Sequence, residues 1–232
     1  MSNISEIINE KSTVAAVDLA YEAKRVQRRR LGLSQAGHKC GRVLWYKHHG
    51  YDEPEIEGRI LRLFKLGEIL EDQTIADLQY AGFNVHSQQK PVEIEMEGVK
   101  LTGSIDGIIE GLIEDPTTPH LWEHKTASLK KYNELIKKGS YRSWNEIYYW
   151  QTQFYMLGLG MDWAAVFVYC KDDSRLYQER IPLDKDATVD RLQDVFRAIS
   201  MENLPERACP RADWWEARFC PFYNECWGMN GC

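Results

Sequence analysis

The residues from Leu101 to Ala127, LTGSIDGIIEGLIEDPTTPHLWEHKTA, constrain the fold more than any other part of the chain. Apolar residues broken by glycines predict two strands in a sharply bent hairpin, followed by a Pro-rich loop and a third strand. Asp106 lies at the bend, and Glu123 and Lys125 lie on the third strand. Because side chains alternate along a strand, Glu123 and Lys125 share one face. Two acids and a lysine that converge at strand ends can form a compact site for a divalent cation and an activated water.

The remaining pattern places helices and strands on both sides of this stretch. Two strongly periodic segments predict a long helix that ends at Gly82 and a second helix over NEIYYWQTQFYMLGLG. Other segments predict, in chain order, a helix over 14–30, a loop and short helix carrying Cys40, a strand over 83–97, a buried strand over 164–169 with a hairpin partner over 176–181, and a helix over 184–203. The Lys-rich segment after Lys125 is typical of a mobile loop, and the tail from Pro205 is too irregular for a regular element.

Length and cysteine content limit the class of protein. The 232 residues can bury one sizeable core, so we expect one domain: an N-terminal helical segment over 1–58, a core over 59–203 and a cysteine-containing tail over 204–232. No apolar run reaches membrane-spanning length and the N-terminus lacks the apolar region of a signal peptide, so we expect a cytoplasmic protein with no membrane partner. In that compartment six cysteines favour metal ligation or buried thiols over disulfides.

Charge is distributed unevenly along the chain. The 35 acidic and 29 basic residues give a net charge of −6, so the overall charge does not indicate a polyanionic partner. Residues 24–48 nevertheless contain eight Lys and Arg residues and no Asp or Glu. This segment is either a phosphate-binding face or a solvated helix face, and its composition alone does not decide between the two.

Four motifs in order give the chain a resemblance to a known family. They are Gly67-x-x-x-Glu71, Ser104-Ile105-Asp106-Gly107, Glu123-His124-Lys125 and Gln151-x-x-x-Tyr155. Together they resemble the PD-(D/E)xK nuclease superfamily, and more narrowly the RecB-type nuclease domain of phage exonucleases and CRISPR-adaptation nucleases. The likeness runs from about Gly32 to Cys226, with Ile105 at the position where the usual pattern has a proline. It implies an α/β, restriction-endonuclease-like core, in which helices flank a central mixed β-sheet.

The resemblance also implies a cation site and roles for the motif residues. Mg²⁺ or Mn²⁺ would be held by oxygen ligands, which hard cations prefer: Glu71, Asp106, Glu123 and the main-chain carbonyl of His124. Lys125 would orient the attacking water and stabilise developing charge. Gln151 and Tyr155 would contact the DNA backbone or the scissile phosphate. The His124 side chain is expected to point away from Asp106 and the metal.

The implied activity is that of a divalent-metal-dependent DNA exonuclease in recombination, repair or phage DNA processing. Its substrate would be single- or double-stranded DNA with a free end, and a phage-encoded chain would act in the host-cell cytoplasm. A homo-oligomer or a recombination partner protein is compatible with this activity. Two alternatives stay open: a structure-specific endonuclease or resolvase on the same core, and a non-catalytic DNA-binding subunit. The candidate DNA contacts are basic residues on either side of the motifs: Arg28, Arg29, Arg30, Arg42, Lys130 and Lys131.

The cysteines extend the resemblance. Cys40, together with Cys220 and Cys226, which have five residues between them, resembles the clamp of RecB-type and CRISPR-adaptation nucleases. In that clamp one N-terminal and three C-terminal cysteines hold a [4Fe–4S] cluster, which would join the two ends of the chain. Thiolates suit zinc as well as iron, so Zn²⁺ stays open as the alternative, and so do unrelated buried thiols.

The fourth ligand of such a site is not given by the usual pattern. Relatives often have C-x-x-C before the five-residue gap, but Ala217 stands at that position here. The fourth ligand would therefore be Cys209 or Cys232. Cys209 is favoured because Cys232 lies on a glycine-flanked chain end, where ordering costs more entropy.

Overall fold

The structure is a computed structural model that describes residues 12–24 and 30–228. The predictions for Arg28, Arg29 and Cys232 lie outside these residues. The described helices are α2 (Thr13–Ala23), α3 (Leu33–Ala36), α4 (Gly41–His48), α5 (Gly58–Tyr80), α6 (Leu129–Lys138), α7 (Tyr141–Trp144), α8 (Glu146–Leu159), α9 (Lys185–Ser200), α10 (Trp215–Arg218) and α11 (Tyr223–Trp227). The strands are β1 (Asn84–His86), β2 (Pro91–Met96), β3 (Val99–Ser104), β4 (Gly107–Glu110), β5 (His120–Ala127), β6 (Trp163–Cys170) and β7 (Leu176–Pro182).

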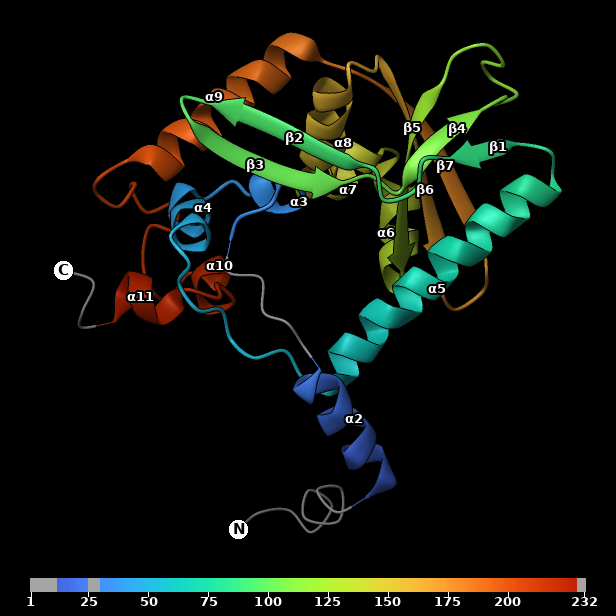
Figure 1. Ribbon diagram of the computed structural model, residues 1–232. Coiled ribbons are helices and arrows are strands. Elements are labelled where there is room, and N and C mark those ends of the chain that lie inside the picture. Colours follow the sequence, from blue (N-terminus) through green and yellow to red (C-terminus); the bar gives the residue numbers. More distant parts are fainter. Residues whose placement is uncertain (1–11, 25–29, 229–232) are drawn as a thin grey trace.

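A mixed five-stranded sheet forms the centre of the fold, in the order β1-β4-β5-β6-β7 (Figure 1). Strands β5 and β6 are parallel, with Glu123 opposite Val166 and Lys125 opposite Val168, and the other neighbouring strands are antiparallel. Strands β2 and β3 form a separate antiparallel ribbon. The fold is therefore α/β with a central mixed sheet, as predicted.

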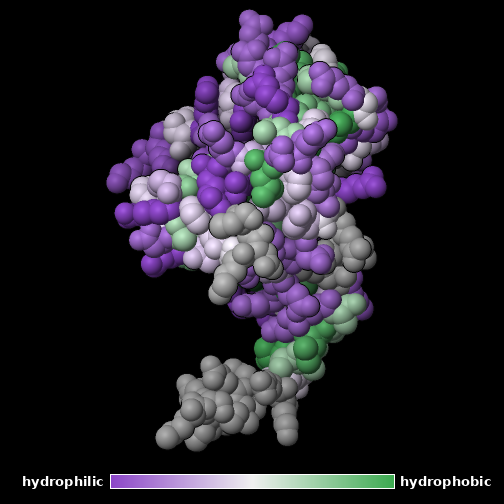
Figure 2. Space-filling view, turned by 90° about the vertical axis from the view of Figure 1, so that its left-hand side faces the viewer, coloured by the Kyte–Doolittle hydropathy of each residue, from purple (hydrophilic) through white to green (hydrophobic). Residues whose placement is uncertain are grey.

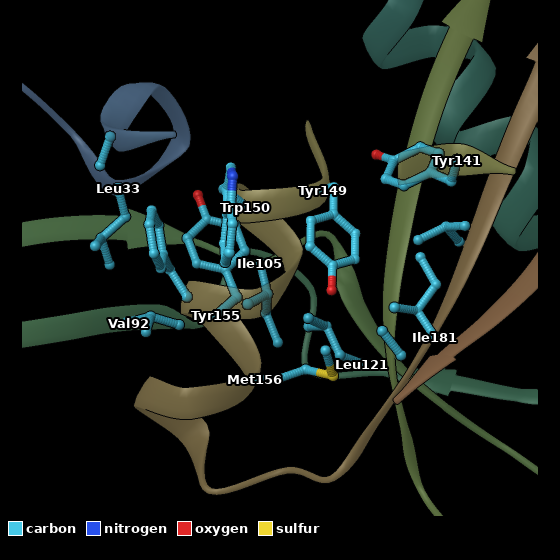
Figure 3. Packing of buried hydrophobic residues seen from close by; sticks show 14 of the residues in the cluster. Leu33, Val92, Ile105, Leu121, Tyr141, Tyr149, Trp150, Tyr155, Met156 and Ile181 are labelled. Carbon is cyan, nitrogen blue, oxygen red and sulfur yellow. The ribbon is translucent and has the colours of Figure 1, made fainter. Parts of the chain in front are cut away.

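Helices cover both faces of this sheet, and strand β5 supplies side chains to both. On one face Trp122 packs with Ile75 and Leu78 of α5. On the other face Leu121 packs in the large cluster to which α8 contributes Phe154, among others. Figure 3 shows this second cluster, with side chains of α8 such as Tyr155 and Met156 beside Ile105 and Leu121. Alternation along β5 thus directs odd-numbered residues toward α8 and even-numbered residues toward α5.

Local capping explains where the predicted helix α8 begins and ends. The Asn145 side chain accepts hydrogen bonds from the backbone N–H groups of Ile147 and Tyr148, at 3.1 and 3.2 Å. At the other end Gly160 has φ of +67°, a left-handed conformation that glycine adopts without steric cost. The two caps set the boundaries of the helix that carries Gln151 and Tyr155.

The long helix α5, the helix α9 and the β6–β7 hairpin lie where the sequence predicts them. One prediction about the central stretch and one about the segment that follows it are wrong. Strands β3 and β4 are not paired with each other, because β3 pairs with β2 and β4 pairs with β1 and β5. The segment predicted as a mobile loop forms helices α6 and α7, since the Ser128 side chain caps the first and the Ser140 side chain caps the second.

The N-terminal segment and the C-terminal tail lie together at α4, α10 and α11 (Figure 1). Val43 and Tyr46 of α4 pack against the fully buried Phe222 of the tail. Arg42 donates through Nε to the backbone carbonyl of Pro205 at 2.6 Å, and the Tyr46 hydroxyl donates to the carbonyl of Glu225 at 3.1 Å. Apolar packing and hydrogen bonds thus join the two segments.

Among the described helices, none combines the length and the apolar character needed to cross a membrane.

Candidate active site

Glu123 and Lys125 form an ion pair on the α8 side of strand β5. The Lys125 Nζ group donates to Glu123 Oε1, and the Glu123 side chain is fully buried. The second carboxylate oxygen, Oε2, is also buried and accepts no hydrogen bond from the described residues. Burial raises the pKa of Glu123, Asp106 adds to the shift, and Lys125 opposes it. Burial likewise disfavours the charge of Lys125, but Glu123 and Asp106 together keep the pKa of its ammonium well above the usual value.

Asp106 lies between strands β3 and β4 and is held against β5. Its Oδ2 atom accepts a 2.8 Å hydrogen bond from the backbone N–H of His124. The preceding residue, Ile105, is fully buried, and its backbone pairs with the carbonyl of Lys90 and the N–H of Gln89. The buried anchor at Ile105 and the bond to β5 fix the carboxylate of Asp106 beside Glu123.

The His124 side chain points to the opposite face, as predicted. Its Nε2 atom lies 3.1 Å from the hydroxyl of Thr74 on α5, which itself donates to the carbonyl of Leu70 at 2.7 Å. Since the Thr74 hydroxyl proton is used in that second bond, His124 Nε2 donates to Thr74. Burial lowers the pKa of His124 to about 3, so this imidazole is neutral and serves to hold α5 against β5.

Glu71 approaches the site from helix α5, one turn before Thr74. It is half-buried, and its Oε1 atom lies 3.5 Å from the Nε2 donor of Gln89. Burial raises the pKa of Glu71 to about 7; Asp106 contributes to the rise and Lys125 opposes it. These influences mean that the carboxylates of Glu71, Asp106 and Glu123 lie within electrostatic reach of one another and of Lys125.

Gln151 and Tyr155 of helix α8 are buried on the side that faces this cluster. Burial, and then the neighbouring Glu123, raise the pKa of Tyr155. The Tyr155 hydroxyl fits closely over Gly103 of β3, where an added Cβ would lie 2.6 Å from its oxygen. The glycine therefore makes the space that the Tyr155 hydroxyl occupies.

Lys125 also adjoins two tyrosines that the motifs do not identify. Tyr148 of α8 lies with its ring 5.2 Å from Lys125 Nζ, a cation–π contact, and the fully buried Tyr141 of α7 is close enough for Lys125 and Glu123 to influence its pKa. Tyr148 packs against the core, and it also covers the ammonium. Its spacing of three residues before Gln151 places both on one face of α8, which is the sequence signal for it.

The three carboxylates fit a divalent cation chemically. They are hard oxygen donors, and the buried Oε2 of Glu123 needs a positive partner to offset its burial. Among the described residues, however, no group of three or more His, Cys, Asp or Glu side chains is arranged to hold a metal ion. Glu123 is turned to Lys125, and Asp106 to the backbone of His124.

The four candidate cluster cysteines line one small cavity between α4 and the tail. Its volume is about 20 Å³, and its lining includes Cys40, Cys209, Cys220 and Cys226. This is room for one or two water-sized bodies, so four irons and four sulfides would require the side chains to move apart. Burial raises the pKa of Cys209 and of Cys220, which keeps both protonated.

The described cysteines are free thiols, and Cys170 is fully buried on β6. In the described part of the tail, too, no three or more His, Cys, Asp or Glu side chains are arranged to hold a metal ion. The structure therefore does not support the predicted cluster, which stays a prediction.

The candidate DNA contacts that the structure describes fall into two groups. Arg30 and Lys130 are exposed, and Lys131 is exposed but paired with Glu134 at 2.9 Å. Arg42 is half-buried and holds the tail through the carbonyl of Pro205. Its guanidinium thus has a structural partner, which leaves Arg42 a weaker candidate than the exposed residues.

Comparison with known proteins identifies the family. The sequence profile described as the PD-(D/E)XK nuclease superfamily matches residues 14–227, nearly the whole chain. The protein belongs to the PD-(D/E)XK nuclease superfamily. This match spans the N-terminal segment, the core and the tail. No match was found among curated protein sequences.

One solved structure shares the fold of this PD-(D/E)XK protein at low sequence identity. A crystal structure of SSO0001 is similar over 91% of this chain and 95% of its own, with 18% identity and a TM-score of 0.51. Two crystal structures of an alkaline exonuclease, LHK-Exo from Laribacter hongkongensis, are also similar. The similarity covers 78% of this chain for LHK-Exo and 80% for LHK-Exo in complex with dAMP. In both cases the similar region covers 90% of the exonuclease chain, with 18% identity and TM-scores of 0.49 and 0.48.

Proposed function

We propose that this protein is a Mg²⁺- or Mn²⁺-dependent deoxyribonuclease, and specifically an exonuclease acting on DNA with a free end. The observation that carries the proposal is the meeting of Glu71, Asp106 and Glu123 around Lys125 in a PD-(D/E)XK chain. These residues come from α5, from the turn between β3 and β4, and from β5. Segments 1–58, 59–203 and 204–232 would form one nuclease domain, which the extent of the family match supports.

The carboxylates of Glu71, Asp106 and Glu123, with the main-chain carbonyl of His124, would hold the cation. A bound Mg²⁺ or Mn²⁺ neutralises phosphoryl oxygens and makes hydroxide available near neutral pH. Lys125, whose pKa is raised, stays charged and can orient a water while it stabilises negative charge on the phosphate.

The remaining side chains of the site would position the substrate and the lysine. Gln151 and Tyr155 present amide and hydroxyl groups from α8, which can hydrogen-bond to the scissile phosphate. The ring of Tyr148 lies over the Lys125 ammonium at 5.2 Å. If Glu123 held a cation in place of Lys125, this ring would remain as a partner for the ammonium.

Substitution of Lys125 tests the catalytic role directly. We expect Lys125→Ala to abolish cleavage of end-labelled DNA in the presence of Mg²⁺ or Mn²⁺, because the charge on the phosphate loses its partner. Lys137→Ala is the matched control, since Lys137 is exposed on α6 and is not one of the candidate DNA contacts. Circular dichroism of both variants checks whether they are folded. Full activity in folded Lys125→Ala contradicts the proposed role.

Circular DNA distinguishes the proposed exonuclease from the alternative endonuclease or resolvase. An exonuclease leaves covalently closed circles intact and degrades the same DNA once it is linear, whereas an endonuclease cuts both. The non-catalytic alternative predicts DNA binding without turnover and no binding of divalent cations in a calorimetric titration.

A metal at Cys40, Cys209, Cys220 and Cys226 is a separate proposal, supported by their shared cavity. A [4Fe–4S] cluster would give a brown protein after anaerobic purification, with four irons per chain by elemental analysis. Colourless protein with one zinc per chain would favour the zinc alternative. Protein with neither metal, and four titratable thiols at these positions, would favour unrelated buried thiols.

A further inference from the structure

Hydrophobic side chains are exposed on the arm formed by α2 and the N-terminal half of α5. Large exposed residues on this arm include Val14, Leu19 and Phe64, with exposed fractions of 60%, 60% and 54%. In Figure 2 hydrophobic side chains gather at the lower end of the molecule, where Figure 1 places α2. Exposed apolar patches of this kind mark interaction sites.

A groove lies on this arm between the two helices. Its volume is about 530 Å³. Its lining combines two aromatic rings, Tyr21 and Phe64, with two lysines, Lys24 and Lys65, and one acidic residue, Glu68. Helix α2 is anchored on α5 beside it, because Glu22 accepts a 2.5 Å hydrogen bond from the N–H of Gly58. The groove is therefore built from packed helices and not from a loop.

The position of the groove relates it to the candidate active site. Phe64 and Glu71 are seven residues apart on α5, so they lie on the same face, separated by roughly 10 Å along the helix axis. That separation corresponds to about three nucleotides of a strand at helical rise. A strand whose phosphate lies at Glu71 can therefore reach Phe64.

The charge around the groove favours a nucleic acid as the occupant. Residues 58–68 contain Arg59, Arg62 and Lys65 and one acidic residue, Glu68, and the lining of the groove itself has two lysines and this one glutamate. Arg62 pairs with Asp18 at 3.0 Å and Lys65 with Glu68 at 2.8 Å, whereas Arg59 is exposed. Aromatic rings next to basic groups bind single strands, since rings stack on bases and cations attract phosphates.

We propose that the α2–α5 groove binds the unpaired bases of a single-stranded DNA segment that leads to the active site. The proposal rests on the proposed nuclease function and adds to it the class of substrate, a single strand or a single-stranded overhang. Phe64 and Tyr21 stack on bases, while Lys24 and Lys65 lie along the phosphates. Lys65 exchanges its surface pair with Glu68 for this contact, at small cost because both side chains are more than half exposed.

Binding of fluorescein-labelled oligothymidine, measured by anisotropy in EDTA, tests the groove without cleavage. We expect Phe64→Ala to weaken binding roughly tenfold, about 1.4 kcal/mol, and Phe64→Tyr, which keeps a ring, to bind like the wild type. Tyr80→Ala is the matched control, because Tyr80 lies at the far end of α5 and is 97% exposed. We expect this control to bind normally, and blunt duplex of the same length to be insensitive to Phe64→Ala.

Several outcomes would overturn the proposal. If the wild type binds and cleaves DNA and Phe64→Ala binds oligothymidine equally well, the proposed role of the groove is refuted, while the proposed nuclease function stands. Wild-type protein that neither binds nor cleaves any DNA refutes both. If light scattering shows a dimer that Phe64→Ala converts to a monomer while DNA binding is unchanged, the arm is an interface between copies of the chain, and the proposal is wrong.

Discussion

The pH dependence of stabilisation by Mg²⁺ is the most direct physical test of the proposed cation site. Burial, and then Asp106, raise the pKa of Glu71 from 4.5 to about 7. A proton and a cation therefore compete for this carboxylate near neutral pH. In metal-free protein the raised pKa favours the folded state at low pH, and this stabilisation is lost as the pH rises from 4.5 through 7. Mg²⁺ should have the opposite dependence.

The size of the effect follows from the fraction of Glu71 that is charged. With a pKa of about 7, this fraction is about 9% at pH 6 and about 91% at pH 8. The apparent affinity for Mg²⁺ therefore rises about tenfold, or about 1.4 kcal/mol of stabilisation at concentrations well above Kd. In a chain of 232 residues, about 1 kcal/mol shifts Tm by about 2–4 °C. Titration of Glu71 alone should thus make the rise in Tm caused by Mg²⁺ about 3–6 °C larger at pH 8 than at pH 6.

Thermal unfolding followed by fluorescence, with Mg²⁺ or EDTA at both pH values, measures this difference. We expect Glu71→Gln to reduce the difference, because the amide does not titrate, while Glu123, whose pKa is also raised, leaves a remainder. Glu68→Gln is the matched control one turn away on α5, where the side chain is 65% exposed, and it should behave like the wild type. An equal Mg²⁺ shift at both pH values in the wild type would refute the reasoning.

Two further predictions concern residues that shape the site. Gly103→Ala should lower the rate of cleavage at least tenfold and lower the free energy of unfolding by about 1–3 kcal/mol, because its Cβ would lie 2.6 Å from the hydroxyl of the buried Tyr155. Gly67→Ala, whose Cβ would make an ordinary 3.7 Å contact, should retain activity, and equal rates of the two variants would count against this. Tyr148→Leu should lower kcat several-fold with little change in KM, because Lys125 loses its cation–π contact, whereas Tyr148→Phe should be near normal; a loss in Tyr148→Phe as large as in Tyr148→Leu would assign the effect to the hydroxyl.

The candidate site could be predicted from the sequence where the chemistry is local. Glu123 and Lys125 are two residues apart on one strand, and strand alternation alone places them on one face. The long helix that carries Glu71 follows from its apolar period and its glycine stop. The convergence of these segments with Asp106 was implied by the resemblance to a family, because no local pattern specifies contacts between residues so far apart.

The rest depended on long-range pairing that the sequence does not encode locally. Glycines and apolar residues in the central stretch predict a bend, but they do not show that β3 pairs with β2 or that β4 pairs with β5. The helix α6 was missed because its lysines suggested a mobile loop, although Ser128 at its start is a good N-cap. The contact of Tyr148 with Lys125 was missed because an aromatic residue among others on a buried helix gives no sign of a charged neighbour.

Strand β5 explains how side chains from distant segments can keep one geometry. Its odd-numbered residues, Glu123 and Lys125, face α8, while the even-numbered His124 donates to Thr74 of α5. Because Thr74 lies three residues after Glu71, this bond fixes the helix, and with it the Glu71 carboxylate, relative to Glu123. The backbone N–H of the same His124 holds Asp106 at 2.8 Å. One buried histidine, whose side chain takes no part in the proposed chemistry, therefore links the three segments whose carboxylates would bind the cation.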